Sequence, residues 1–305
     1  MGSSVKRSIK LISTIMLLLC ACYSTGATVG LLVEDKNQQV MDFQSELSKL
    51  RPADELNLYT LKSLPKNPKE TKVATWLAMG AKPLATLLSR LENTKDVRIL
   101  GLFIRAEAQT KLENLFPNKS FSLLDNSPPL TRQLALIKVL SPQIKSVAIF
   151  YANEAPVNLN NLNLLAKKLG LTIQTAAIND PLNWERASLK VLKETDVVLG
   201  VNEPAIYNAT TIRSILMRLY RASRPLLGPD KGYVRAGAVA STYSGVKETI
   251  KAVAHILSSE QTLPNIVQNP HFNVVVNTQV ARSLDINVVD VKQLSQQVRE
   301  VLNEK

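Results

Sequence analysis

The fold is decided by a stretch of alternating elements at residues 145–175, which reads KSVAIFYANEAPVNLNNLNLLAKKLGLTIQT. It opens with an apolar run at 147–151, of the kind that forms a strand buried on both faces. The following residues place four apolar side chains on one helix face: Leu159, Leu162, Ala166 and Leu169. A second apolar run at 171–175 completes the unit. This order predicts two parallel strands joined by a helix.

The same alternation continues on both sides of this stretch. Upstream, Ser127 is expected to cap a helix that has Pro128 at its first position. Downstream we expect a helix at 184–192, a strand at 197–201, a helix at 204–220 and a strand at 225–228.

The first half follows the same pattern. Strands are expected at 29–33, 56–58, 73–79, 99–104 and 121–124, with helices at 40–50 and 84–91. The segment 63–72 carries two prolines and three lysines and is predicted to be a loop. Together the two halves predict an α/β fold of two doubly wound parallel-sheet lobes, with a cleft between them.

The N-terminus predicts export. Three basic residues precede an apolar run at 11–21, which is too short to span a membrane. The run ends in Leu19-Cys20-Ala21-Cys22, which is similar to a bacterial lipobox, so we expect 1–22 to be a signal peptide with its lipobox and Cys22 to be lipidated. The alternative is plain cleavage near Ala27, which would remove both cysteines. In either case the folded part begins near Thr28.

Composition limits the classes of protein. The chain has 305 residues, of which 45% are hydrophobic and 20% charged, and a formal net charge of +12. Such a length suits two packed cores. No run of Lys or Arg exceeds the pair Lys167-Lys168, so we expect the positive charge to lie on solvated helix faces. No nucleic acid is expected as a partner, and a membrane only through the lipid anchor.

The residues offer little for catalysis. Both cysteines lie in the N-terminal segment, and His255 and His271 are isolated from each other. No phosphate-binding loop, dinucleotide fingerprint or nucleophile elbow occurs. Glu34 and Asp35 are an acid–base pair in principle, but adjacent carboxylates after a strand are more often solvated or cap a helix. We therefore expect a binding protein, not an enzyme, with no metal and no cofactor.

Candidate ligand-binding residues follow the predicted strands, because the loops of an open α/β sheet meet at its carboxyl edge. They are Gly80, Ala81, Asp125, Asn126, Asn153, Asn202, Glu203 and Asp230. Gly80 allows close approach of the backbone and exposes the N–H groups of a helix start, which suits an anion. Glu203 and Asp230 suit an amine. The alternative is that Asn, Asp and Gly simply make good turns after strands.

A family resemblance appears in the same region. It is carried by the segments at 128–137, 146–151, 196–202, 204–208, 233–238 and 277–284, which read PPLTRQLALI, SVAIFY, DVVLGVN, PAIYN, YVRAGA and NTQVARSL. Together they resemble the ABC-transporter substrate-binding family related to tryptophan- and tyrosine-binding proteins. The resemblance implies a type I periplasmic binding fold with three crossovers, near Asp125, Ser241 and Leu263. Lobe one would then be 28–125 plus 242–262, and lobe two 126–241 plus 263–305.

The resemblance also implies a function. It predicts a monomeric periplasmic lipoprotein that captures a small organic ligand between its lobes and passes it to an ABC permease in the inner membrane. Gly80-Ala81-Lys82 stands where family members that bind amino acids tend to offer hydroxyl groups, which argues against an amino acid as the ligand. The alternative is an envelope sensor or scaffold that keeps the fold and acts through a protein partner.

The lipid anchor gives the first testable prediction. Replacing Cys22 by Ser should abolish incorporation of labelled fatty acid, because the thioether-forming sulfur is lost. Incorporation that survives Cys22→Ser and disappears with Cys20→Ser would move the site by two residues. A wild-type chain that incorporates no fatty acid would indicate plain secretion.

Overall fold

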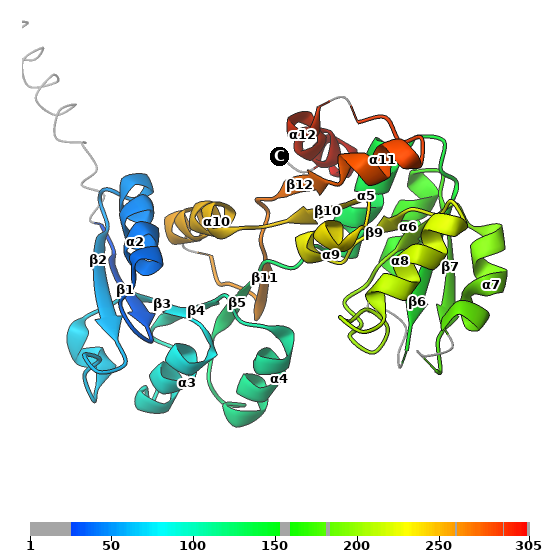
Figure 1. The fold of residues 1–305 in the computed structure, drawn as a ribbon. Coiled ribbons are helices and arrows are strands. Elements are labelled where there is room, and N and C mark those ends of the chain that lie inside the picture. Colours follow the sequence, from blue (N-terminus) through cyan, green and yellow to red (C-terminus); the bar gives the residue numbers. More distant parts are fainter. Residues whose placement is uncertain (1–25, 153–158, 181–183, 260, 289, 304–305) are drawn as a thin grey trace, which may run out of the picture. The chain divides into compact units, whose positions relative to one another are not determined.

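The computed structural model describes residues 26–152, 159–180, 184–259, 261–288 and 290–303 (Figure 1). The chain forms two compact units. The first holds the described residues up to Leu123 together with Leu263–Asn265, and the second holds Leu124–Thr262 and the residues from Ile266 onward. This division leaves 242–262 with the second unit, whereas the resemblance assigns them to lobe one, and that assignment stays a prediction.

The first sheet has six strands in the order β11-β5-β4-β3-β1-β2. The strands are β1 (Thr28–Val33), β2 (Glu55–Thr60), β3 (Thr75–Met79), β4 (Arg98–Leu102), β5 (Ser122–Asp125) and β11 (Ile266–Gln268). Neighbouring strands from β5 to β2 in this order pair in parallel. Gly30 in β1 makes room for Trp76, because a Cβ atom at Gly30 would lie 2.6 Å from the indole.

The helices of the first unit are α2 (Gln38–Leu50), α3 (Ala81–Arg90) and α4 (Ala106–Leu115), with a 3₁₀ turn η1 (Pro68–Thr71). α2 and α3 are amphipathic: Phe43 and Leu47 of α2, and Leu84 and Leu87 of α3, are buried. Burial of these apolar faces against the sheet stabilises the unit.

The second sheet also has six strands, in the order β12-β10-β9-β8-β6-β7. They are β6 (Ser146–Tyr151), β7 (Thr172–Ala177), β8 (Val197–Leu199), β9 (Leu226–Leu227), β10 (Ala240–Tyr243) and β12 (Asn273–Val276). β12 runs antiparallel to β10, and the other pairs are parallel. The two sheets confirm the predicted fold class.

Eight helices are described in the second unit. They are α5 (Leu130–Leu140), α6 (Leu159–Lys168), α7 (Trp184–Glu194), α8 (Ile212–Arg221), α9 (Lys231–Ala236), α10 (Val246–Ser258), α11 (Thr278–Ser283) and α12 (Val291–Leu302). α5 and α12 contact each other, as do α7 and α8. Across the residues that the structure describes, no helix combines the length and apolar character needed to cross a bilayer.

Each sheet contains a point where the strand order reverses. In the first sheet the chain moves outward from β1 to β2 and then returns past β1 to β3. In the second sheet it moves from β6 to β7 and returns past β6 to β8. In open α/β sheets the loops diverge at such a switch point and leave a crevice at the carboxyl ends of the strands. The crevices are therefore expected beside the ends of β1 and β3, and of β6 and β8.

Three connections join the two sheets, as the resemblance implies. They run from β5 to β6, from β10 to β11 and from β11 to β12. The third was expected near Leu263 but lies at 269–272, because the chain first adds β11 to the edge of the first sheet. The sequence did not predict this strand, whose three residues are too few to show a period.

Two helix starts differ from the prediction. α5 begins at Leu130, and its N-cap residue is Pro129, not Ser127. Ser127 lies in a local turn, where its N–H donates to Asp125 Oδ1 (2.8 Å). The helix predicted at 204–220 begins only at Ile212. The Asn208 side chain accepts from the N–H groups of Thr210 and Thr211 (2.9 and 3.1 Å), which holds the backbone in turns before α8.

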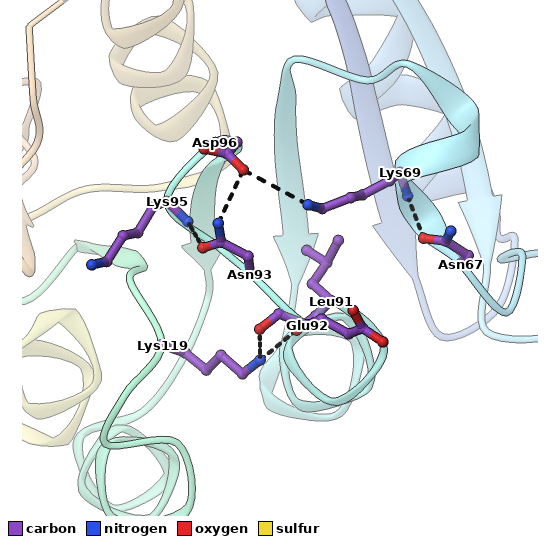
Figure 2. Close-up of polar contacts among 8 residues, drawn as sticks. All are labelled: Asn67, Lys69, Leu91, Glu92, Asn93, Lys95, Asp96 and Lys119. Atoms are coloured by element: carbon purple, nitrogen blue, oxygen red, sulfur yellow. Dashed lines mark hydrogen bonds and ion pairs between the residues drawn. The ribbon is translucent and has the colours of Figure 1, made fainter.

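Polar contacts join the loops that precede β4 and β5 in the first unit (Figure 2). Lys119 Nζ donates to the carbonyl oxygens of Leu91 and Glu92, just beyond the C-terminus of α3, where a cation is favourable. Lys69 Nζ lies 3.7 Å from Asp96 Oδ2. The Lys69–Asp96 pair, together with hydrogen bonds from Arg90 to the carbonyl oxygens of Leu64 and Pro65, links segment 63–72 to its neighbours, and within it only η1 is helical.

One buried side chain links α5 to the second sheet. Gln133 is 1% exposed. Its Nε2 donates to the Gly228 carbonyl (2.8 Å) and to Ser241 Oγ (2.9 Å), and its Oε1 accepts from the Thr242 N–H (3.0 Å). Gln133 thereby fixes the end of β9, from which the loop to Asp230 starts.

Replacing Gln133 by Leu should lower the free energy of unfolding by about 2–4 kcal/mol, because buried backbone groups would lose their partners. Urea denaturation of the two proteins measures this difference. Gln279→Leu, on the exposed side of α11, is the matched control and should change stability by less than about 0.5 kcal/mol. Equal effects of the two substitutions would show that the Gln133 bonds do not hold the unit together.

Candidate functional site

The first half-site lies at the switch point of the first sheet. Gly80 follows β3 and is the N-cap of α3, with a φ of +104° that favours glycine, and no side chain caps this helix. Ala81, the other candidate here, is the first residue of α3 and is half-buried. Glu34 follows β1, so both loops border the same crevice.

An ion pair crosses this crevice. Lys82 Nζ lies 2.5 Å from Glu34 Oε1, and both side chains are exposed. The hydrogen bond to Glu34 and its negative charge raise the pKa of Lys82. Asp35 adds a second negative charge beside the pair, and the exposed Lys36 of the same loop adds a second positive one, so the first half-site presents two carboxylates and two ammonium groups.

The second half-site lies at the switch point of the second sheet. Glu203 follows β8, and its Oε2 accepts from the N–H of Ala152, which follows β6, at 3.4 Å. Its Oε1 accepts from the Ala205 N–H (3.3 Å). The neighbouring Asn202 is exposed, and its side chain makes no hydrogen bond within the described residues. A carboxylate thus bridges the switch point in each unit.

Asp230 follows β9 on the same edge of the second sheet. It is the N-cap of α9, and its Oδ1 accepts from the Gly232 N–H at 2.5 Å. Its first oxygen therefore has a local structural role, as the alternative of a simple turn after the strand predicts, while the side chain remains exposed. Lys231, the next residue, lies 5.1 Å above the ring of Tyr243.

Two tyrosines brace the loops of the second half-site, and the sequence did not single them out. Tyr233 Oη donates to the carbonyl oxygen of Tyr207 (2.7 Å), and the two rings meet edge to face at 6.5 Å. Burial, with smaller contributions from Tyr233 and Glu203, raises the pKa of Tyr207. The Tyr207 phenol is buried and has no hydrogen-bond partner among the described residues, so it stays protonated. The brace links the loop after β8 to α9.

Asp125 and Asn126 hold the connection between the sheets together. Asn126 Nδ2 donates to Thr249 Oγ1 (3.0 Å), and its Oδ1 accepts from Asn269 Nδ2 (2.7 Å). Asp125 Oδ1 accepts from the Ser127 N–H. These bonds engage both polar atoms of the Asn126 side chain and one carboxylate oxygen of Asp125, and a ligand contact at these residues stays a prediction. Asn153 and Cys22 lie outside the described residues.

Comparison with known proteins places this geometry in a family. The family model described as "ABC transporter substrate binding protein" matches residues 116–300, more than half of the chain. The chain belongs to this family. No curated protein matches the sequence.

Solved structures are similar to this substrate-binding protein. The ligand-free, open structure of CD0873, a substrate binding protein with adhesive properties from Clostridium difficile, is 14% identical. The match covers 87% of this chain and 96% of that chain, with a TM-score of 0.61. An ABC domain in complex with L-Trp from Streptococcus pneumonia is 17% identical over 92% of this chain and 98% of that chain, with a TM-score of 0.46. At these identities the likeness to CD0873 shows the fold.

The family settles the class of function. Substrate-binding proteins of ABC transporters bind small molecules outside the cytoplasm and are not enzymes, in agreement with the sequence prediction. Among the described residues, no three His, Cys, Asp or Glu side chains gather as metal ligands would.

A surface hollow of about 380 Å³ lies elsewhere in this substrate-binding protein, between α11 and residues 285–288. No candidate residue lines it. Its polar lining residues, such as Arg282 and Asp285, are exposed. The hollow is also remote in sequence from the strand ends that form the switch points, so we do not place the ligand there.

The capping role of Asp230 gives a stability prediction. Asp230→Ala should lower the free energy of unfolding by about 1 kcal/mol, because the Gly232 N–H loses its acceptor. Asp230→Asn keeps an acceptor oxygen and should leave stability within a few tenths of a kcal/mol of the wild type. Thermal unfolding of both variants measures this. If both lose the same stability, the cap depends on the charge of Asp230 and not on its acceptor oxygen.

Proposed function

We propose that this substrate-binding protein captures a small organic ligand with a cationic amine and delivers it to an ABC permease. The observation that carries the proposal is the clustering of acidic side chains at the carboxyl edges of both sheets. Glu34 and Asp35 follow β1, Glu203 follows β8 and Asp230 follows β9. Carboxylates favour a cationic group through charge-assisted hydrogen bonds.

Charge balance supports an amine over an anion. At the first half-site Lys82 pairs with Glu34, and Lys36 of the same loop offsets the charge of Asp35. At the second, Lys231 lies over the ring of Tyr243, and no ion pair involving Glu203 or Asp230 is found within the described residues. The second half-site therefore keeps negative charge available, which would attract a cation and repel an anion.

The family and the sequence predictions support the remaining parts of the proposal. The ligand would contact both half-sites, so binding would shift the population toward a closed arrangement. A permease in the membrane would then receive the ligand. The predicted lipidation of Cys22 would keep a monomeric protein at the cell envelope, on the side where the substrate arrives.

The first experiment identifies the ligand. Native mass spectrometry of protein purified from its own host weighs a bound molecule directly. A cationic amine supports the proposal, and a ligand with only anionic groups contradicts it.

The second experiment tests the site with that ligand, by calorimetry of Asp230→Asn. If the carboxylate pairs with a buried amine in the complex, affinity should fall about 30-fold to several thousand-fold, equivalent to about 2–5 kcal/mol. The control is Asp290→Asn. Asp290 is likewise an exposed N-cap in the same unit, accepts from the Lys292 N–H (2.8 Å) and lies on α12.

Binding of Asp230→Asn within twofold of the wild type would remove Asp230 from the site. Equal losses in Asp230→Asn and Asp290→Asn would indicate a general effect of net charge. Asn202→Ala, measured in parallel, tests the neighbouring exposed amide, which makes no hydrogen bond within the described residues.

A further inference from the structure

Two neighbouring helices cover one face of the second sheet. α7 joins β7 to β8 and α8 joins β8 to β9, both in the same direction across the sheet, so right-handed crossovers place them on one face. They contact each other. Arg224 Nε, just beyond α8, donates to the Leu192 carbonyl in the last turn of α7 (3.0 Å), which ties the helix ends together.

The outward side of these helices mixes cations with exposed apolar side chains. We call it the cationic face. It consists of Arg186, Leu189, Lys190 and Lys193 of α7 and Arg213, Met217, Tyr220 and Arg221 of α8, all of them exposed. The apolar members are 40% exposed at Leu189, 50% at Met217 and 53% at Tyr220.

The fold gains nothing from three of these cations. Arg186 and Lys190 are four residues apart on α7, where like charges repel. Arg213 lies in the first turn of α8, where the helix dipole disfavours a cation and no acidic residue is present. Lys193 and Arg221 lie near the helix C-termini, where the helix dipole favours a cation. These two residues are therefore not used as evidence for an external partner.

These cations also lack internal partners. Within the described residues, Arg186, Lys190 and Arg213 form no ion pair. The unpaired charge on α7 and α8 is therefore available to an external anion.

The chemistry of the face favours a lipid surface over a protein. Protein interfaces are depleted of charged residues at their centres, lysine in particular, whereas the two helices carry five exposed cations on this face against two exposed carboxylates, Glu185 and Glu194 of α7. Anionic lipid headgroups attract Lys and Arg, and exposed Leu, Met and Tyr side chains suit the boundary between headgroups and acyl chains. We propose that the cationic face docks on an anionic phospholipid surface, in addition to the predicted lipid anchor.

Vesicle flotation tests the proposal without the anchor. The chain from Tyr23 to Lys305 contains every described residue and no cysteine. It should bind vesicles of equal parts phosphatidylglycerol and phosphatidylcholine, should not bind pure phosphatidylcholine, and should be released by about 0.5 M NaCl.

Charge reversal locates the surface. Each cation near an anionic leaflet strengthens binding about fivefold, so Lys190→Glu/Arg213→Glu should weaken vesicle binding at least about 25-fold. The control is Lys167→Glu/Lys168→Glu on α6, which changes the net charge equally. α6 joins β6 to β7 in the opposite direction across the sheet and so lies on its other face. The control should bind within about threefold of the wild type.

A fluorescent label provides a readout that does not depend on charge reversal. An environment-sensitive dye on Met217→Cys should shift its emission to the blue when anionic vesicles are added. The same dye on Leu164→Cys, which is 63% exposed on α6, should not respond.

Three outcomes would overturn the proposal. They are absence of wild-type binding to anionic vesicles, equal losses in the two charge-reversed proteins, and equal responses of the two labels. The first outcome would point to an acidic protein as the partner of this face. The second would show that vesicle binding depends on the net charge of the protein and not on this face. None of these results depends on the ligand site, so the proposed transport function is tested separately.

Discussion

Parallel strands can be joined only by a crossover that runs back along the sheet, and the crossover is right-handed. In both units this constraint places helices on the two faces of a sheet and buries the strands between them. β1 and β6 are accordingly apolar almost throughout. The reversal of direction beside each of these strands also creates the two switch points, so fold and candidate site have one origin.

The switch points differ in how they use their carboxylates. At the first, Glu34 pairs with Lys82 across the crevice. At the second, Glu203 accepts backbone N–H groups from the loop after β6 and from its own loop. Hydrogen bonds of this kind hold a carboxylate in place while leaving its charge available to a ligand. The Tyr207–Tyr233 brace stiffens the second site, so less conformational entropy remains to be lost on binding.

Charge is thus distributed with opposite sign over different parts of the second unit. Acidic groups gather at the carboxyl edge, where loops present them to a small molecule. Unpaired cations lie on α7 and α8, along one face of the sheet. Because the two sets occupy different surfaces, ligand capture and contact with an anionic membrane would not compete, and each can be tested alone.

The sequence alone determined the fold class and most of the order of elements up to β9, because periodicity and apolar runs are local properties of the chain. It placed Glu203 and Asp230 after strands of one sheet for the same reason. Only the tertiary structure decided which groups are engaged. The bonds of Asn126 to Thr249 and Asn269 span more than a hundred residues, and those of Gln133 reach β9 and β10. Such partners depend on how distant segments pack, which no local pattern encodes.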